Sequence, residues 1–471
     1  MKVGLERGNQ AFSRRGFLGM GIVGAVMTAA DWRIWAADEG LPAYYGEHLA
    51  KVAARLRTLS ATCDDAFFFI TDLHVPSNRC ISGRILAKLI GETDVRKVLC
   101  GGDMPEAFGG KASVDRTIAA YREQWVATVE RAGGAFYPAK GNHDFTIRDS
   151  PRASSGFTYD GKTARDILMD TAAVKASAVT NPKDPAACYY YVDFPKVGIR
   201  YIVADTTDSV RLDRTYWAVR YGMGERQLNW LAKNALATIP RGWAVLVMQH
   251  IPMTGVVSGE SGNGTLFAPW RNLLEAYQNR GKACVGGREY DFSNAGGVIL
   301  CNLTGHEHAE RQTFQHGLWH ITEPCDAAYS DYIVGSTPWC ADLPNKDKGT
   351  VFEQTFDAVH IDVLNRALHF TRIGGGGNRT VHLAGRCVQT GKSLKFAAAK
   401  GMGAVKWGCY DADRAKPVQN PKNRYQHFYH FFNDVADISA DGTFTAKKAG
   451  DAVVLATAPD GDKELFAVHV A

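Results

Sequence analysis

Several features that would assign this chain to a special class are missing from its sequence. Its ten cysteines are scattered over 471 residues, with no Cys-x-x-Cys pair, so a small disulfide-stabilised fold is excluded. We expect most of these thiols to be free and buried. If any disulfide forms, Cys325 with Cys340 or Cys387 with Cys409 would close a short loop. No internal repeat appears, and the apolar run Met20–Ala30 is too short to span a bilayer.

A strong charge of one sign is also lacking. The formal net charge is +5, and residues 1–30 hold a surplus of +3, because Lys2, Arg7, Arg14 and Arg15 oppose Glu6 alone. The remaining residues carry about +2, which is too little to predict nucleic acid or a membrane surface as a partner.

The N-terminus has the features of a targeting segment. The stretch Ser13-Arg14-Arg15-Gly16-Phe17-Leu18-Gly19 precedes the short apolar run, which ends in small residues. This order resembles a twin-arginine signal, which implies export of the folded protein to the periplasm or the extracellular space. Residues 1–37 would then be signal and linker, and the mature chain would have no transmembrane segment. The alternative is a chance arginine pair ahead of a core helix.

The body of the chain has a globular composition, with 45% hydrophobic and 22% charged residues. Its length predicts one large domain and a smaller module. After a helical pattern within 38–62, apolar runs alternate with amphipathic segments, which indicates a layered α/β domain over 38–373. The predicted strands are 66–71, 97–100, 135–139, 189–194, 200–204, 243–248 and 297–303. The predicted helices are 82–91, 114–132, 164–176, 225–237 and 268–278. Segments 356–363 and 367–373 read as a closing hairpin.

Four consecutive glycines, Gly374 to Gly377, are the clearest break in the chain. Because glycine is conformationally permissive, we predict a linker at 374–380 and a small all-β domain at 381–471. Alternating segments at 443–445, 452–458 and 465–470 support antiparallel strands there. Residues 441–452 resemble the late strands of bacterial group 2 Ig-like domains.

Five short polar motifs each follow a strand-like run. They are Asp72-Leu73-His74, Gly102-Asp103, Gly141-Asn142-His143-Asp144, His250 and Gly305-His306-Glu307-His308. Because open α/β sheets bind ligands beyond the carboxyl ends of their strands, these side chains are expected to meet in one pocket. Carboxylate, amide and imidazole groups are suited to divalent metal ions.

In this order the motifs resemble the signature of the calcineurin-like metallophosphoesterases: D-x-H, G-D, G-N-H-[DE], a lone H and G-H-x-H. The resemblance implies a β-sandwich flanked by helices and a pair of divalent ions, Mn, Fe or Zn. It implies that the first ion is held by Asp72, His74, Asp103 and His308. The second would be held by Asp103, Asn142, His250 and His306, so that Asp103 bridges the two.

Residues beside the predicted ligands have candidate roles as well. By the resemblance, His143 would donate a proton to the leaving oxygen as the general acid. Asp144 would orient His143, or it would cap a following turn, and the sequence leaves both open. Asn78 and Arg79 are candidate substrate-binding residues, with a solvated loop or a helix cap as the alternative.

The predicted function is hydrolysis of a phosphomonoester or phosphodiester by a metal-bound hydroxide. Two cations neutralise an anionic ester and ionise water at neutral pH, which explains why hard and borderline donors are needed. The alternative is a non-catalytic protein on a degenerate phosphoesterase scaffold, which contacts the envelope or glycan through its C-terminal domain.

Overall fold

The computed structural model describes residues 40–75, 78, 80–105, 110–144, 159–213, 218–253, 267–327, 346–419 and 427–471. The chain divides into two units, Met1–Gly40 and Leu41–Ala471. Only Gly40 of the first unit is described, so the expected twin-arginine signal lies outside the described residues. Within the described ranges, every helix is too short or too polar to cross a membrane.

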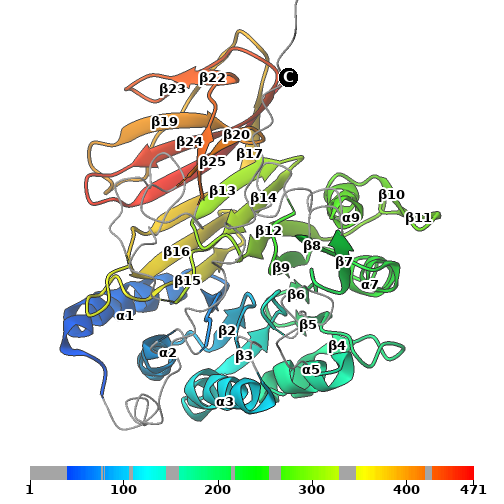
Figure 1. The fold of residues 1–471 in the computed structure, drawn as a ribbon. Helices are drawn as coiled ribbons and strands as arrows, with labels where there is room; N and C mark the ends of the chain where they lie inside the picture. The colour runs from blue at the N-terminus through cyan, green and yellow to red at the C-terminus, as the bar shows by residue number, and fades with distance from the viewer. Residues whose placement is uncertain are drawn as a thin grey trace, which may run out of the picture. The chain divides into compact units, whose positions relative to one another are not determined.

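The first sheet has nine strands, and Figure 1 shows it running from β3 to β19. In sheet order the strands are β19 (Lys406–Asp411), β24 (Gly450–Thr457), β25 (Lys463–Val470), β17 (Arg379–Val388), β16 (Ala367–Gly374), β15 (Thr355–Asp362), β1 (Asp65–Ile70), β2 (Lys97–Cys100) and β3 (Ala135–Pro138). Strands β1, β2 and β3 are parallel. Their carboxyl ends therefore lie at one edge of the sheet.

The second sheet has seven strands. In sheet order they are β13 (Arg311–Gln315), β14 (Leu318–Thr322), β12 (Val298–Thr304), β9 (Ala244–Met248), β6 (Ile199–Val203), β5 (Tyr190–Phe194) and β4 (Val179–Thr180). Strands β14, β12, β9 and β6 are parallel. The two sheets touch where the rings of Phe67 and Tyr201 lie 5.7 Å apart and Tyr201 donates to Asp65.

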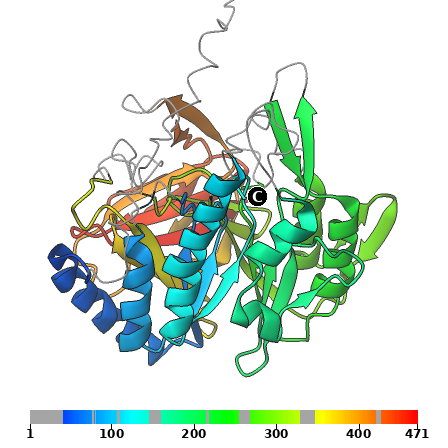
Figure 2. The same ribbon diagram turned by 60° about the horizontal axis from the view of Figure 1, so that its bottom comes forward.

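Helices cover both sheets. They are η3 (Ala43–Tyr45), α1 (Gly46–Ser60), α2 (Ile81–Glu92), α3 (Lys111–Tyr121), the π-helix η4 (Arg122–Ala127), α4 (Thr128–Arg131), α5 (Gly161–Leu168), α6 (Ala172–Ser177), α7 (Glu225–Trp230), the π-helix η7 (Leu231–Leu236) and α9 (Ala268–Gln278). Figure 2 shows the blue and cyan helices α1, α2 and α3 side by side. On the second sheet, Trp270 and Leu274 of α9 pack in one apolar core with Val245 and Val247 of β9.

Shorter strand groups complete the fold. They are the pairs β7 (Ser209–Asp213) with β8 (Ala218–Gly222), β10 (Lys282–Val285) with β11 (Arg288–Asp291) and β20 (Ala415–Gln419) with β21 (His427–Phe431), and the sheet β18 (Ser393–Lys395), β23 (Thr443–Ala446) and β22 (Ala436–Ile438). The predicted α/β sandwich with a C-terminal β-rich region is therefore confirmed, as are the strands before each polar motif.

One predicted helix is wrong, because 164–176 is divided into α5 and α6. Thr171 interrupts it: its Oγ1 caps α6 by accepting from the Val174 N–H at 3.2 Å. The same hydroxyl donates to the carbonyl of Phe136 at 2.8 Å, which ties the break to β3. A threonine at such a position favours a helix start over a helix interior.

The four glycines connect two paired strands. Gly374 ends β16 and Arg379 begins β17, which is the antiparallel neighbour of β16. A Cβ on Gly374 would lie 1.7 Å from the carbonyl oxygen of Gln354, so this glycine permits close backbone packing. The predicted linker 374–380 is therefore the connection between two neighbouring strands of one sheet. The division at 381–471 into a separate domain stays a prediction.

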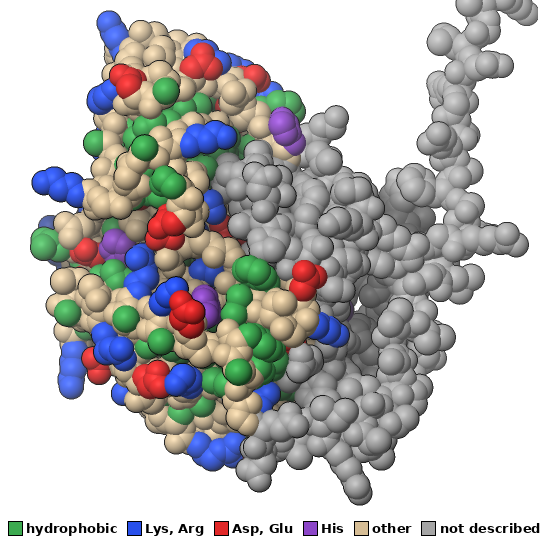
Figure 3. Space-filling model, turned by 90° about the vertical axis from the view of Figure 1, so that its left-hand side faces the viewer, with side chains coloured by type: hydrophobic (Ala, Val, Ile, Leu, Met, Phe, Trp, Pro, Cys, Tyr) green, Lys and Arg blue, Asp and Glu red, His purple; other side chains and the backbone are tan. Residues whose placement is uncertain are grey.

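The C-terminal β-rich region has an apolar core of its own, formed by Phe396, Phe444, Val454, Phe466 and their neighbours. On the face in Figure 3, acidic and basic side chains of the described residues are interspersed. The suggested Cys387–Cys409 disulfide is wrong, since both thiols are free. Cys325 is free as well, and Cys340, its suggested partner, lies outside the described residues.

Candidate metal centre

The seven predicted metal ligands converge where strands of both sheets end. Asp72 and His74 follow β1, Asp103 follows β2, Asn142 follows β3, His250 follows β9, and His306 and His308 follow β12. Three overlapping groups each bring donor atoms within 4.8 Å of one another: Asp72, His74 and His308; His74, Asp103 and His143; Asp103, His250 and His306. The groups overlap at His74 and Asp103, so the donors form one continuous cluster.

The first half of the cluster surrounds Asp72. Nε2 of His308 lies 3.2 Å from Oδ1 of Asp72, and Nε2 of His74 lies 3.7 Å from the same oxygen. The two imidazole nitrogens are themselves 2.9 Å apart. The other carboxylate oxygen of Asp72 accepts from Thr71 Oγ1 at 2.7 Å. Two ring nitrogens and one carboxylate oxygen thus face the same point.

The second half surrounds Asn142 and Asp103. Oδ1 of Asn142 lies 2.9 Å from Nε2 of His250 and 2.8 Å from Nδ1 of His306. Oδ2 of Asp103 lies 3.2 Å from Nε2 of His250 and 3.9 Å from Nε2 of His74. Asp103 therefore contacts both halves of the cluster, which is the place predicted for a bridging carboxylate.

The backbone is strained at these ligands. Asp72, His74, Asp103, His306 and His308 all have positive φ, between 47° and 72°. Such left-handed conformations are unfavourable for residues with a Cβ, and they concentrate at functional sites where the surrounding structure enforces them. The strain turns side chains from separate loops toward one point.

Glycines beside the ligands provide the space for this approach. A Cβ on Gly305 would lie 2.4 Å from Oδ2 of Asp72, and one on Gly141 would lie 2.1 Å from Oδ1 of Asp103. Only glycine lets the backbone come this close to the carboxylates. This explains the glycine of the Gly141-Asn142 and Gly305-His306 motifs.

The electrostatics suit cation binding. Burial alone would raise the pKa of Asp103, but His250 and His143 outweigh burial and lower it. Burial likewise opposes ionisation of Asp72, yet His308 and His74 hold its pKa well below the usual range. Both carboxylates are therefore ionised, as metal ligands must be.

The contacts of the two ring nitrogens of His250 are those expected of a metal ligand. Its Nδ1 lies 2.8 Å from the carbonyl oxygen of Gly101, while its Nε2 faces the oxygens of Asn142 and Asp103. Burial lowers the pKa of His250, but Asp103 raises it to about 9. The polar partners of both ring nitrogens are oxygen atoms. With Nδ1–H held by Gly101, Nε2 is oriented toward the position that a metal ion would take.

His143 and Asp144 follow Asn142 in sequence but lie in different surroundings. The backbone N–H of His143 donates to Oδ1 of Asp103 at 2.7 Å, its Nε2 lies 3.9 Å from Oδ2, and the side chain is 25% exposed. Asp144 is fully buried and accepts from the backbone N–H groups of Asp103, Met104 and Gly141 at 2.8–2.9 Å. Burial and the charge of Asp103 raise its pKa to about 7. Asp144 thus fixes the two loops; a catalytic role for it stays a prediction.

Of the two candidate substrate-binding residues, Asn78 is held by structural contacts. Asn78 is fully buried, donates to Oδ2 of Asp326 at 2.7 Å and accepts from the N–H of Cys80 at 3.0 Å. These contacts hold the turn that leads into α2, and substrate binding by Asn78 stays a prediction. Arg79 lies outside the described residues.

Three supporting residues were not anticipated from the sequence: Thr71, Gly101 and Asp326. Thr71 and Gly101 each lie next to a motif, at the end of a strand. That position is the only feature of the sequence that could have predicted their role. Asp326 accepts from Ser82 at 2.5 Å, and its N–H donates to the carbonyl of Thr71 at 2.9 Å. No motif surrounds Asp326, and only the fold brings it to the β1 loop.

Comparison with known proteins adds one strong match. A family model described as calcineurin-like phosphoesterase matches residues 66–310. No curated protein matches the chain significantly.

Among solved structures, the chain is similar to GAP50, the anchor in the inner membrane complex of Plasmodium, at 13% identity and a TM-score of 0.35, covering 65% of this chain and 84% of that one. It is also similar to phosphopantetheinyl hydrolase from Mycobacterium tuberculosis, at 11% identity and a TM-score of 0.26, covering 56% and 91%. A third is Vps29 from Chaetomium thermophilum, at 10% identity and a TM-score of 0.22, covering 65% and 85%.

Proposed function

Because the chain belongs to the calcineurin-like phosphoesterase family, we propose that it is an exported hydrolase of phosphomonoesters or phosphodiesters that binds two divalent metal ions. The observation that supports this most is the convergence of Asp72, His74, Asp103 and His250 with the other ligands in overlapping donor groups. An ordinary capping or turn role for each motif would not bring their side chains together.

Each half of the cluster offers one ion a plausible ligand set. Asp72, His74 and His308 with one oxygen of Asp103 would hold the first ion. Asn142, His250 and His306 with Asp103 would hold the second. When bound, such ions neutralise the phosphate and lower the pKa of water, which is the chemistry that ester hydrolysis needs. Mn, Fe and Zn all accept nitrogen and oxygen donors of this kind.

His143 is the residue that would act on the substrate directly. Its backbone N–H is fixed by Asp103, and its ring is partly exposed at the edge of the cluster. A histidine there can protonate the leaving alkoxide or phenoxide as the ester bond breaks. Asp144 supports His143 indirectly, because it accepts hydrogen bonds from the backbone N–H groups of Asp103 and Gly141 and so holds the two loops.

The proposed location follows from the N-terminal sequence. Arg14-Arg15 and the apolar run after them resemble a twin-arginine signal, so the enzyme would act in the periplasm or outside the cell. Because that route carries folded proteins, the metal ions would be loaded before export. An Ig-like character of residues 381–471 and a contact with envelope or glycan remain predictions.

The Asp103→Ala variant tests the proposed function. Asp103 lies between both halves of the cluster, so its loss should remove ions from both. Turnover of p-nitrophenyl phosphate and bis-p-nitrophenyl phosphate should fall by more than about 1,000-fold. Bound divalent ions supply several kcal/mol to such reactions, and about 1.4 kcal/mol corresponds to tenfold in rate. Metal content is measured by mass spectrometry of the protein purified with manganese.

The control is Asp441→Ala, which removes an exposed aspartate that pairs with Lys395 in the C-terminal region. It should keep two ions and full turnover. A wild-type protein that binds no metal and turns over neither ester would favour the non-catalytic scaffold and end this proposal. Equal turnover by Asp103→Ala and wild type would also contradict it.

A further inference from the structure

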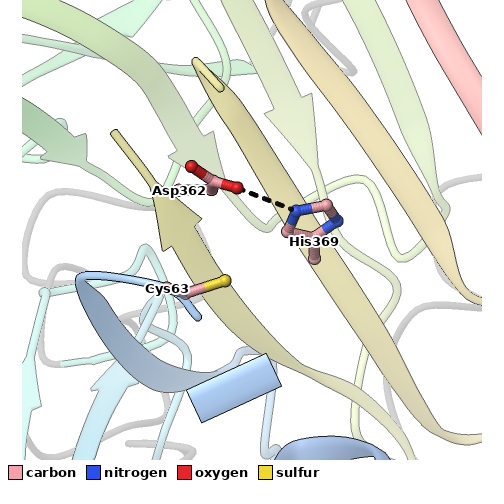
Figure 4. Close-up of side chains that lie close together, drawn as sticks. All are labelled: Cys63, Asp362 and His369. Atoms are coloured by element: carbon pink, nitrogen blue, oxygen red, sulfur yellow. Dashed lines mark ion pairs between the residues drawn. The ribbon is translucent and has the colours of Figure 1, made fainter. Parts of the chain in front are cut away.

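A second set of metal-competent side chains lies outside the phosphoesterase centre. Cys63, Asp362 and His369 bring a sulfur, a carboxylate oxygen and an imidazole nitrogen within 4.8 Å of one another. Cys63 follows α1, whereas Asp362 and His369 lie on the paired strands β15 and β16. Figure 4 shows the three side chains around a common space. The turn after α1 meets the β15–β16 hairpin at this cluster.

Both strand residues are oriented by contacts behind them. Nδ1 of His369 lies 3.0 Å from Oγ1 of Thr380 on β17, so its Nε2 faces Asp362, with 3.9 Å between Nε2 and Oδ2. Asp362 accepts from the backbone N–H and the side-chain amide of Asn365 at 2.8 and 2.7 Å. Outer contacts of this kind fix the ring and carboxylate of metal ligands before the ion binds.

Among the described residues, Asp362 forms no ion pair with a lysine or arginine. It is 7% exposed, and its ion-pair partner is His369, on which the positive charge of Arg55 also acts. A buried carboxylate is unfavourable unless a positive charge or enough hydrogen bonds offset it. The amide donors of Asn365 are neutral, so a cation between Asp362, Cys63 and His369 would supply the missing charge.

We propose that Cys63, Asp362 and His369 bind one divalent transition-metal ion, such as Zn²⁺, at a site separate from the phosphoesterase centre. A thiolate and an imidazole favour Zn²⁺ or Co²⁺ over Mg²⁺ or Ca²⁺. In a tetrahedral zinc site, nitrogen and oxygen ligands lie about 3.4 Å apart, so His369 and Asp362 need to approach by only about half an ångström. Because Cys63 and His369 are partly exposed, water can take the fourth position. The ion would join α1 to the hairpin.

Cobalt substitution of the full chain tests this site. The proposed ligands of the phosphoesterase centre include no cysteine, so thiolate-to-cobalt absorption in the near ultraviolet distinguishes the two sites. Wild type should show this absorption and bind one more equivalent of Co²⁺ than Cys63→Ser or His369→Gln. The matched control is Cys284→Ser, which changes an exposed cysteine on β10 and should keep the absorption.

A measurement on unmodified protein covers the case in which a variant fails to fold. Zn²⁺ should slow alkylation of Cys63 by iodoacetamide at least tenfold, whereas exposed Cys284 and Cys387 should react at unchanged rates. Two outcomes would overturn the proposal: no thiolate absorption in wild type with Co²⁺, or alkylation of Cys63 at the same rate with and without Zn²⁺. Neither readout depends on phosphoesterase activity, so the proposed function is tested separately.

Discussion

Two buried clusters of carboxylates in this protein differ in how their charge is neutralised. In the first, Arg372 and Arg379 of β16 and β17 contact Glu310, Glu323 and Asp357, and all five side chains are at most 1% exposed. In the second, the ion-pair partners of Asp72 and Asp103 among the described residues are histidines. The first cluster contains its own arginines, whereas the described residues supply none to the second.

The arginine cluster is close to neutral as folded. Burial opposes ionisation of Glu310, but Arg379 and Arg372 lower its pKa to about 2, and the pKa of Asp357 is lowered in the same way. Burial raises the pKa of Glu323 well above its usual range, which lessens the negative charge that the two arginines have to match. Arg372 and Arg379 pair with all three carboxyl groups. Such a cluster joins the strands and needs no ligand.

The metal centre shows the opposite arrangement. Its ligands occupy strained backbone conformations, and within the described part of the chain its ionised carboxylates form ion pairs with histidines and with no lysine or arginine. Strain and unmatched charge oppose folding unless something binds there. The difference indicates that the chain supplies cations to one buried carboxylate cluster and leaves the ionised carboxylates of the other to be matched by a bound cation.

The largest effect in this comparison is the fall in kcat expected for His143→Gln. The substitution removes the proposed general acid and leaves the carboxylates unchanged, so kcat should fall about 10²- to 10⁴-fold while both ions remain bound. The loss should be greater for an alkyl phosphate than for p-nitrophenyl phosphate, because nitrophenolate leaves without a proton.

Two results would contradict that prediction. Loss of metal from His143→Gln would show that His143 is a metal ligand of the centre. An equal loss of kcat for both leaving groups would remove the general-acid role. His469→Gln, which changes an exposed histidine paired with Asp451, is the control and should leave both readings unchanged.

The next largest effect is expected in the arginine cluster. Arg379→Met keeps much of the side-chain volume over Phe370 but leaves Asp357 and Glu310 with one arginine. Removing one partner of a buried ion pair lowers the free energy of unfolding by about 3–5 kcal/mol. Urea unfolding measures this change, and Lys395→Met, at an exposed pair, should leave the midpoint unchanged. A loss below about 1 kcal/mol would show that the cluster is not a closed unit.

The two clusters also differ in how well the sequence predicted them. The metal ligands come in short motifs after strands, and glycine or alternating apolar residues beside them mark where each strand ends. That local pattern predicted the strands before Asp72, Asp103, Asn142, His250 and His306, and the structure brings these side chains together. A sheet with parallel strands does so whatever the loops between them contain.

The arginine cluster has no local pattern. Glu310, Glu323, Asp357, Arg372 and Arg379 come from separate strands and turns, and each resembles an ordinary surface charge in sequence. Their contacts depend on β17 continuing the first sheet after the glycines, where the sequence suggested a flexible linker. Gly374 is needed for backbone packing against Gln354, and composition alone does not distinguish that use of glycine from flexibility.

The smallest of the expected effects, counted for each bound ion, separates the clusters by their dependence on added metal. A ligand at 100 times its dissociation constant stabilises the folded state by about 2.7 kcal/mol, so chelation should lower wild-type stability by roughly that amount for each ion removed. Arg379→Met should keep this dependence in full, because its cluster is neutralised by the chain. Asp103→Ala should lose most of it, since its centre no longer binds ions. Chelation could instead leave the free energy of unfolding of wild type unchanged. The folded protein would then be equally stable without cations beside Asp72 and Asp103, and the two clusters would not differ in their need for a ligand.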